Sequence, residues 1–394
     1  MPWTEESTMD LRRQFVQDVQ GGIAPLVELC AAYQISRKTG YKWLTRFEAG
    51  GMAALGDQSR RPHTSPRATP PELVRALLDA RHRHPTWGPR KLLHLVRQQL
   101  PAAPWPARST IALHLARAGL VVAPRRVRRP GHPGRPQAPM DAPNAVWTAD
   151  FKGQFRTGDG AECFPLTVAD GYSRMLLVCR ALTSTRVIET RPYFLRAFQE
   201  FGLPQRIRSD NGVPFATQAL GRLSPLSVWW VRLGILPDLI EPASPQQNGR
   251  HERMHRTLKR DTARPPRATR SAQQRRFDAW RTEYNTLRPH EALADATPAS
   301  LYAPSPRSMP SRLPPLEYPG HYAVRRVSTN GGIRWDARWV NVTHTLGGEY
   351  VGLVEIDDGE WDLYFGPLRL GRFHERTYLV EDIHGRQRRR RRRQ

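Results

Sequence analysis

Apolar residues near the amino terminus of this chain recur at the spacing of α-helices. Two such runs lie within residues 27–47, and the break between them spans only two residues. Ser36 is a good N-cap for the second run, and Gly50-Gly51 are typical of a helix end. Because so few residues join the two helices, we predict a helix-turn-helix domain at residues 1–56.

Three further amphipathic runs fall within residues 69–123. The last of them follows a proline-rich turn and begins at Ser109-Thr110, which makes it the candidate recognition helix of a second helix-turn-helix domain. Trp87 lies in the loop between the first two runs, and its size favours a place in the core over stacking on bases. The three helices are expected within residues 71–83, 88–100 and 108–120.

Residues 144–302 alternate between strand and helix patterns, which predicts an α/β domain. A strand over 145–153 places Val146, Thr148 and Asp150 on one face, because side chains alternate along a strand. The other expected elements are a hairpin over 162–182 that turns at Asp170-Gly171, a helix over 185–202 that contains Pro192, strands over 205–210 and 237–244, and a helix over 244–261 with Ser244 as N-cap and Gln247 completing a capping box.

Short β segments separated by Gly-containing turns occupy residues 318–376, a pattern typical of a small β-barrel. A basic Pro/Gly linker at 124–143 and a basic tail at 385–394 hold too few apolar residues to form a core. The expected architecture is therefore multidomain, with all-α helix-turn-helix modules, an α/β core and a C-terminal small β-barrel.

The charge balance of the sequence indicates the kind of partner that the protein binds. Lys and Arg number 61 against 36 Asp and Glu, which gives a formal net charge of +25. Such an excess favours a polyanionic partner, nucleic acid before an acidic lipid surface. No apolar run approaches the ~20 residues that span a bilayer, and no signal-peptide core is present, so we expect no membrane partner. Three cysteines are too few for a disulfide framework, which favours a reducing, cytoplasmic setting.

Basic and hydroxyl side chains at the starts of the two candidate recognition helices suit DNA, because the first turns of such helices enter the major groove. The alternative is an ordinary helical hairpin with a solvated basic face. The arginine-rich linker is expected to lie along phosphates. The predicted DNA-binding residues in these regions are Arg37, Lys38, Thr39, Lys42, Arg108, Ser109, Thr110, Arg125, Arg126, Arg128 and Arg129.

Three acidic residues of the α/β domain stand where acidity is unexpected. Asp150 interrupts an apolar strand, Asp210 follows a short strand, and Glu252 lies on an otherwise basic helix. Each alone is explained by a turn or by an i,i+4 salt bridge. Together, three hard oxygen ligands on separate elements of a basic protein favour Mg²⁺. Glu252 shares a helical face with Arg256 and Lys259, which suits a metal site beside a phosphate.

The segments around these acids resemble a known family. "WTADFKG", "RSDNGVPF" and "SPQQNGRHERMHRTLK" are similar to the three signature segments of the integrase-type DDE transposases of bacterial insertion sequences, which are relatives of retroviral integrases. "YNTLRPHEAL" followed by "ATPAS" resembles the segment after the catalytic helix, and "WGPRKL" resembles part of the tandem helix-turn-helix region. The motifs are specific because they occur together in this order.

The resemblance implies an RNase H-like core, which is a five-stranded mixed sheet flanked by helices. By position, Asp150, Asp210 and Glu252 match the DDE triad, which would hold two Mg²⁺ ions, with Mn²⁺ as a possible substitute. Arg256 and Lys259 match basic positions that contact the DNA end of the element. The sequence departs from the family in the 41 residues between Asp210 and Glu252, more than is usual, which we interpret as a surface insertion around "GRLSPLSVWW".

Other residues near the third acid have competing interpretations. Glu241 is the nearby alternative to Glu252, but it precedes the capping signals and so is not on the helix. His251 and His255 are expected to contact DNA or to support the structure rather than to act as general bases, since metal ions supply the activation in such sites.

The resemblance implies a transposase that binds the inverted-repeat ends of an insertion sequence and catalyses Mg²⁺-dependent cleavage and strand transfer into target DNA. Its partners would be double-stranded DNA and further copies of itself, at least a dimer, in a bacterial cytoplasm. The alternative is a catalytically inactive or domesticated transposase that acts as a sequence-specific DNA-binding protein. An RNA-degrading nuclease agrees poorly with two DNA-reading modules.

Overall fold

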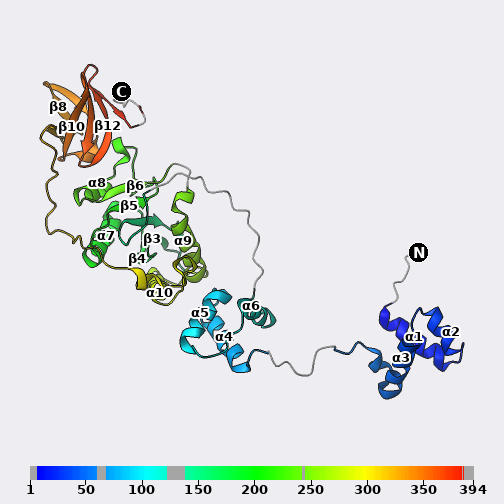
Figure 1. Cartoon of the computed structure of the whole chain (residues 1–394). Helices are drawn as coiled ribbons and strands as arrows, with labels where there is room; N and C mark the ends of the chain where they lie inside the picture. The colour runs from blue at the N-terminus through cyan, green and yellow to red at the C-terminus, as the bar shows by residue number, and fades with distance from the viewer. Residues whose placement is uncertain (1–6, 60–67, 122–137, 242–244, 384, 386–394) are drawn as a thin grey trace. The chain divides into compact units, whose positions relative to one another are not determined.

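The computed structural model describes residues 7–59, 68–121, 138–241, 245–383 and 385 (Figure 1). By internal contacts it divides into two units, Met1–Ala68 and Thr69–Gln394. Most of the predicted linker, and the predicted tail from residue 386 onward, lie outside the described residues. In the described part of the chain, no helix is both long and apolar enough to cross a membrane.

The first unit holds α1 (Thr8–Gln20), α2 (Leu26–Ala32), α3 (Arg37–Gly50) and a 3-10 turn at Gly51–Leu55. The Ser36 hydroxyl accepts a hydrogen bond from the Thr39 backbone N–H at 3.1 Å, so it caps α3 as predicted. Gly51 ends α3 with a φ of 59°, a conformation that favours glycine. The helix-turn-helix prediction is confirmed, and α1 adds a third helix that contributes Phe15 to the buried core.

The second unit begins with the three helices predicted for the second helix-turn-helix, which are α4 (Pro71–Arg83), α5 (Pro89–Gln99) and α6 (Arg108–Arg117). Trp87 lies between α4 and α5 and is only 1% exposed. Its ring stacks on His84 with centroids 4.2 Å apart. Trp87 is therefore a core residue of this domain, as predicted.

A mixed sheet follows, built from β1 (Val146–Phe151), β2 (Phe155–Arg156), β3 (Glu162–Asp170), β4 (Leu176–Leu182), β5 (Arg206–Ser209) and β6 (Leu236–Leu239). β1 is parallel to β5, and β5 is parallel to β6. β3 pairs antiparallel with β1, β4 and the short edge strand β2. The main order β4-β3-β1-β5-β6 agrees with the five-stranded mixed sheet expected of an RNase H-like core.

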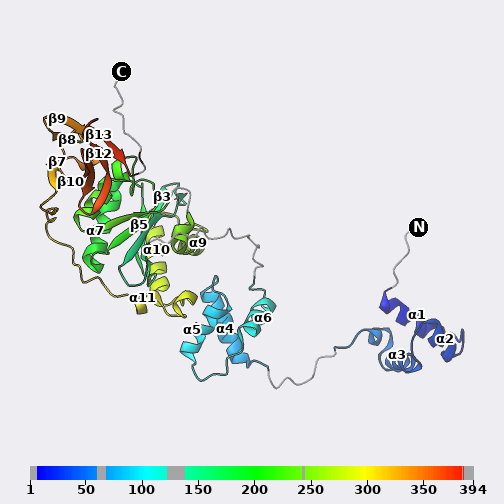
Figure 2. The same cartoon turned by 45° about the horizontal axis from the view of Figure 1, so that its top comes forward.

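Helices cover both faces of this sheet (Figures 1 and 2). One face carries α7 (Val187–Phe201), which continues through Pro192, and α8 (Pro225–Arg232). The other face carries α9 (Gly249–Thr262) and α10 (Arg270–Thr286), followed by a 3-10 turn (Glu291–Leu293) and α11 (Pro298–Leu301). Each face has its own apolar core, so α9 is fixed against the sheet by buried contacts such as those of Met254 and Leu258.

The structure contradicts the interpretation of "GRLSPLSVWW" as a surface insertion. This stretch forms a 3-10 turn at Leu220–Arg222 and then α8, whose Trp230 is 0% exposed. Ser224 caps α8 through a capping box with Ser227, which starts the helix immediately after the turn. The extra length is therefore part of the core, because α8 packs its apolar residues against both the sheet and the C-terminal domain.

Trp230→Ala should destabilise the protein by about 3–5 kcal/mol, because it leaves a cavity among Phe194 and Phe215. Urea denaturation would measure this loss. Ile188→Ala on α7 is a suitable control, since Ile188 is 81% exposed and its truncation should cost less than about 0.5 kcal/mol. Equal stabilities of the two variants would restore the surface-insertion interpretation.

The start of α9 also differs from the prediction. The α-helix begins at Gly249, after a 3-10 turn at Pro245–Asn248. Ser244, the predicted N-cap, lies outside the described residues. The Gln247 side-chain oxygen accepts a hydrogen bond from the Glu241 backbone N–H at 2.8 Å, so Gln247 anchors the incoming loop to this turn.

The C-terminal domain is not the predicted closed barrel. One sheet has the order β13-β12-β11-β10-β7, and β8 and β9 form a separate hairpin. In the described pairings β7 and β13 remain edge strands, so the larger sheet stays open, and its last strand ends at Asp382 rather than within 318–376. The strands are β7 (Ala323–Arg326), β8 (Gly332–Trp335), β9 (Arg338–Asn341), β10 (Tyr350–Asp357), β11 (Glu360–Phe365), β12 (Leu368–His374) and β13 (Leu379–Asp382), with a 3-10 turn at His344–Leu346 between β9 and β10.

Candidate active site

Strand β1 presents its two faces to different helices. Trp147 and Ala149 enter the core beneath α7 and α8. Thr148 points the other way, since its hydroxyl lies 2.7 Å from His251 Nδ1 on α9. Because side chains alternate along a strand, Asp150 shares the face of Thr148. The predicted face of β1 is thus the one that α9 covers.

Asp210 stands where β5 ends. Its Oδ1 accepts a hydrogen bond from the Gly212 backbone N–H at 3.1 Å, which closes a tight Asx turn. The next residue fixes this turn to its surroundings, because the Asn211 amide donates to the Ile240 carbonyl at 2.7 Å and accepts from Arg222 at 2.9 Å. The segment "RSDNGVPF" therefore forms a turn, and the hydrogen bonds of this turn also fix the position of the Asp210 carboxylate.

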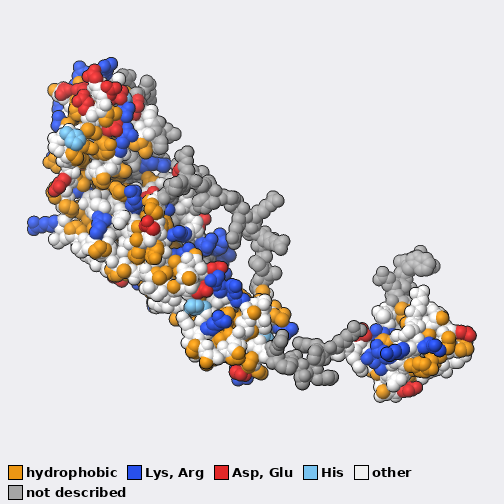
Figure 3. All heavy atoms as spheres, viewed as in Figure 1, with side chains coloured by type: hydrophobic (Ala, Val, Ile, Leu, Met, Phe, Trp, Pro, Cys, Tyr) orange, Lys and Arg blue, Asp and Glu red, His pale blue; other side chains and the backbone are white. Residues whose placement is uncertain are grey.

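Glu252 lies on the exposed face of α9 together with Arg256 and Lys259. The buried face of the same helix carries His251, Met254, His255 and Leu258, which sets the helix rotation. Space-filling atoms show Lys and Arg side chains gathered over the α9 end of the core (Figure 3). The three residues predicted to share one helical face do so.

The Asp150 carboxyl is buried and has Asp210 and Glu252 among its charged neighbours. The pKa of Asp150 is raised from the ordinary 3.8 to about 7, mainly by burial and in addition by the Asp210 and Glu252 carboxylates. The Phe151 backbone N–H and the Lys152 ammonium act in the opposite direction. β1, the end of β5 and α9 therefore bring negative charges near the buried Asp150, and this repulsion costs free energy without a bound cation.

This pKa predicts a stability that depends on pH. Because the pKa of Asp150 is higher in the folded than in the unfolded chain, folding loses stability as pH rises from about 4 to about 7. Asp150→Asn should remove this loss, so in EDTA at pH 8 the variant should be more stable than wild type by up to about 4 kcal/mol, at 1.36 kcal/mol per pKa unit.

Thermal unfolding of both proteins in EDTA from pH 4 to pH 8 would measure the effect. The difference in melting temperature should grow with pH and level off above about pH 7. Glu200→Gln is the matched control, since Glu200 is exposed on α7. Parallel pH profiles for wild type and Asp150→Asn would show that Asp150 ionises as an ordinary carboxyl.

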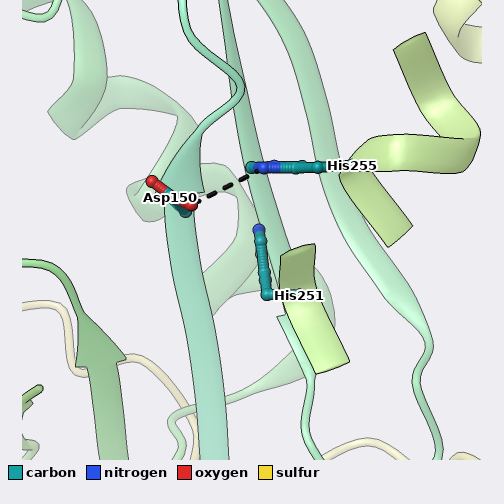
Figure 4. Close-up of side chains that lie close together, drawn as sticks. All are labelled: Asp150, His251 and His255. Carbon is teal, nitrogen blue, oxygen red and sulfur yellow. Dashed lines mark ion pairs between the residues drawn. The ribbon is translucent and has the colours of Figure 1, made fainter. Parts of the chain in front are cut away.

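Two buried histidines lie behind Asp150. His255 Nδ1 lies 3.5 Å from Asp150 Oδ2, and Figure 4 shows both His255 and His251 directed from α9 toward β1. The other nitrogens lie within hydrogen-bond distance of hydroxyls: His251 Nδ1 of Thr148, and His251 Nε2 and His255 Nε2 of Thr167, at 2.6–2.7 Å. Burial lowers the pKa of His251 to about 3 and that of His255 well below its usual range, so both rings are neutral.

Asp150, His251 and His255 could by distance alone hold a metal ion. However, threonine hydroxyls lie against both nitrogens of His251 and against Nε2 of His255, and His255 Nδ1 faces Asp150, so the rings serve to support β1 and α9. The oxygen atoms of Asp150, Asp210 and Glu252 are the hard ligands that Mg²⁺ prefers. A divalent cation would also offset the repulsion that, after burial, contributes to the raised pKa of Asp150.

Lys152 belongs to the same neighbourhood and was not predicted. Burial and the Lys259 charge lower its pKa, while Asp150 and Glu252 act in the opposite direction. It stands two residues after Asp150, and the strand alternation that placed Asp150 on the α9 side of the sheet could have placed Lys152 there too. A lysine near the Asp150 and Glu252 carboxylates and the Lys259 ammonium suits contact with a phosphate oxygen.

The predicted DNA-binding residues occupy the expected helices where the structure describes them. Arg37, Lys38 and Lys42 are exposed on α3, whereas the Thr39 hydroxyl lies 2.9 Å from that of Ser36 and so takes part in the cap. The first turn of α6 carries the second group, in which Arg108 and Ser109 are exposed and Thr110 is half-buried. The linker residues Arg125, Arg126, Arg128 and Arg129 lie outside the described residues.

Family comparisons agree with this arrangement. Integrase core domain profiles match residues 140–245, which contain Asp150 and Asp210, and residues 233–298, which contain Glu252. A helix-turn-helix domain profile matches residues 11–63, and a homeodomain-like profile matches residues 39–115.

Curated relatives come from mobile elements. The chain is 28% identical over 237 residues to an uncharacterized 31.7 kDa protein of insertion element IS407 from Burkholderia multivorans, covering 59% of this chain and 80% of that protein. It is 27% identical over 266 residues to a 39.2 kDa protein of insertion element IS476 from Xanthomonas euvesicatoria, covering 66% and 73%. Among solved structures, the HTLV-2 integrase catalytic core domain in complex with magnesium matches 41% of this chain and 97% of that one at 17% identity, with a TM-score of 0.33 that marks a weak similarity.

Proposed function

We propose that this chain, which belongs to the insertion-sequence transposases of the retroviral integrase superfamily, binds the inverted-repeat ends of its element and catalyses Mg²⁺-dependent cleavage and strand transfer. The observation that carries this proposal is that the buried Asp150 carboxyl has two further acids, Asp210 and Glu252, among its charged neighbours. Both Asp210 and Glu252 contribute to the raised pKa of Asp150. No single local motif requires these three acids to be neighbours.

Asp150, Asp210 and Glu252 would together hold two Mg²⁺ ions, with Mn²⁺ as a substitute. When bound, these ions supply positive charge to the reacting phosphodiester and polarise its P–O bonds. The chain's own contribution is to fix the ligands: the Asx turn orients Asp210, and the buried histidines hold α9 against β1. Arg256 and Lys259, which are exposed on the same helix as Glu252, would bind phosphates of the DNA end.

The chemistry has two steps, each a displacement at phosphorus. In cleavage, a water oxygen bonds to phosphorus while the bond to the 3′ oxygen of the element end breaks, which leaves a free 3′-hydroxyl. In strand transfer, that hydroxyl oxygen bonds to a target phosphorus while the bond to the target's 3′ oxygen breaks. Neither step needs a nucleophile from the protein.

Two helix-turn-helix domains would select the DNA. α3 and α6 would each place a basic first turn in the major groove, and two such readers on one chain suit a site longer than a single groove can offer. Because strand transfer joins two element ends to one target, the active form would contain at least two copies of the chain.

A strand-transfer assay tests the proposal. Purified protein, a labelled duplex that ends in the element's inverted repeat, and a supercoiled target are incubated with Mg²⁺ or with EDTA. We expect joined products with Mg²⁺ and none with EDTA. Specific binding of the repeat without joining in either condition would instead support the alternative, a transposase that acts only as a DNA-binding protein.

A further inference from the structure

A small basic cavity lies beside α9, on the side of the helix away from Glu252. It has a volume of about 80 Å³. Residues far apart in the sequence line it, from α5, from the turn between β3 and β4, from α9, and from the segment after α10. Its lining includes the cationic or titratable side chains of Lys91, Arg174, Arg250, Arg253, Arg288 and His290.

The cavity lining itself offers little negative charge to balance these cations, of which Arg288 pairs with Asp261 at 3.4 Å. Asp170 is the one carboxylate in the described lining, and it is already engaged. It accepts hydrogen bonds from the Asn144 backbone N–H at 2.8 Å and from Ser173 at 2.6 and 2.8 Å. Within the described part of the chain no ion pair joins a carboxylate to Lys91 or Arg174, so their charges remain open to a ligand.

Two buried nitrogens in this cavity lack a hydrogen-bond partner among the described residues. They are Nε of Arg174 and Nε2 of His290, the latter on a side chain only 8% exposed. Native proteins pair nearly all buried polar atoms, so such atoms indicate a missing ligand or water. Arg174 also adopts a φ of 64°, a strained value for a side chain with a Cβ, which the turn imposes as it directs Arg174 here.

Lys91 is held at the cavity by neighbouring contacts between α5 and the core. Arg90 pairs with Glu291 at 2.5 Å and with Asp295 at 2.9 Å, and His84 Nδ1 lies 2.9 Å from Glu283. Burial, followed by the charges of Arg288 and Arg260, lowers the pKa of Lys91 to about 8. The Lys91 ammonium group is therefore held where burial and neighbouring cations disfavour its charge, and a bound anion would stabilise that charge.

We propose that this cavity binds a phosphate group of the DNA backbone, at a point separate from the phosphodiester that the three carboxylates address. Planar guanidinium groups from several directions match the oxygens of a phosphate. One side of α9 lines the cavity with Arg250, Arg253 and Thr257. Another side of the same helix presents Glu252, Arg256 and Lys259 of the candidate active site. The inference rests on the proposed function, because DNA is the assumed source of the phosphate.

Through this contact α5 becomes part of the DNA-holding surface of the core. A duplex that reaches the carboxylates along α9 would be held at a second point, and Lys91 would contribute to that point from the second helix-turn-helix domain. The predicted set of DNA-binding residues contained neither Lys91 nor Arg174, because neither lies on a candidate recognition helix.

The salt dependence of DNA binding tests this site without any cleavage. Fluorescence anisotropy of a labelled duplex with the full chain in EDTA gives the slope of log K against log salt concentration. Each phosphate contact adds about 0.9 to the magnitude of this slope. Lys91→Gln combined with Arg174→Gln should lower it by about that amount, whereas Arg275→Gln, an exposed change on α10, should leave it unchanged. Equal slopes for all three proteins would overturn the proposal.

A second measurement uses the wild-type chain, so it does not depend on the variants folding. Acetylation of Lys91 is followed by peptide mass spectrometry with duplex DNA, with inorganic phosphate, or with chloride at equal ionic strength. Protection of Lys91 by the duplex supports the site. Protection by inorganic phosphate but not by the duplex would assign the cavity to a free anion, and no protection by either would refute it.

Failure of this inference and failure of the proposed function have different signatures. Unchanged salt slopes in a chain that still joins DNA would refute the cavity site alone. If the Lys91→Gln, Arg174→Gln variant shows the expected smaller salt slope but the wild-type chain never joins DNA, catalysis alone would be refuted.

Discussion

Asp210→Asn should reduce Mg²⁺-dependent strand transfer by at least about 10³-fold, which corresponds to about 4 kcal/mol at 1.36 kcal/mol per tenfold change. The substitution keeps the size of the side chain, and its amide oxygen can still accept the hydrogen bond from Gly212 that closes the turn. The variant should therefore fold and bind the repeat normally. What it loses is one negative charge among three ligands.

The measurement is the rate of joining at fixed Mg²⁺ concentration, with repeat binding followed in parallel by gel shift. Glu200→Gln on α7 removes a charge from an exposed position on the other face of the sheet and should retain full joining. Joining by Asp210→Asn at the wild-type rate would remove Asp210 from the active site. Loss of both joining and binding would indicate a folding defect.

Deleting residues 1–68 should lower the preference for the inverted repeat over random DNA by about 10³-fold or more. The first unit has its own core around Phe15 and Trp43, so its removal leaves residues 69–394 as a separate compact unit. Nonspecific binding should persist, because it depends on the phosphate contacts of the remaining basic surface.

Competition of labelled repeat against unlabelled random duplex measures this preference. Within the full chain, Arg37→Gln should lower it by about 1–3 kcal/mol if α3 reads bases, whereas Arg13→Gln on the exposed face of α1 should not. An unchanged footprint on the repeat after the deletion would assign sequence recognition to the second unit.

Local sequence patterns predicted the elements that carry the site, because caps and alternation act within a few residues. Ser36 as a cap and the shared face of Thr148 and Asp150 are examples. The assignment of Asp150, Asp210 and Glu252 to one site came from motif order and stays a prediction. Local patterns could not predict how β1, the end of β5 and α9 meet, since that depends on pairing β1 with β5 and on packing α9 over β1.

Errors arose where tertiary packing decided the outcome. "GRLSPLSVWW" looked like an insertion because its length was unusual, but its tryptophans fill the core. The barrel prediction was right that this domain consists of several short strands. Closure of a barrel depends on pairing the two edge strands, which sequence spacing does not encode. The ion pairs of Arg90 and the cavity around Arg174 join segments about 200 residues apart, beyond any local pattern.

Binding of Mn²⁺, followed by electron paramagnetic resonance during a titration of the full chain, tests the central claim most directly. The claim is that Glu252, rather than Glu241, completes a set of three metal-holding carboxylates. We predict that Glu252→Gln weakens Mn²⁺ binding at least tenfold and that Glu241→Gln, a change in an exposed acid, leaves it unchanged. Wild-type affinity in Glu252→Gln, or lost affinity in Glu241→Gln, would contradict the account.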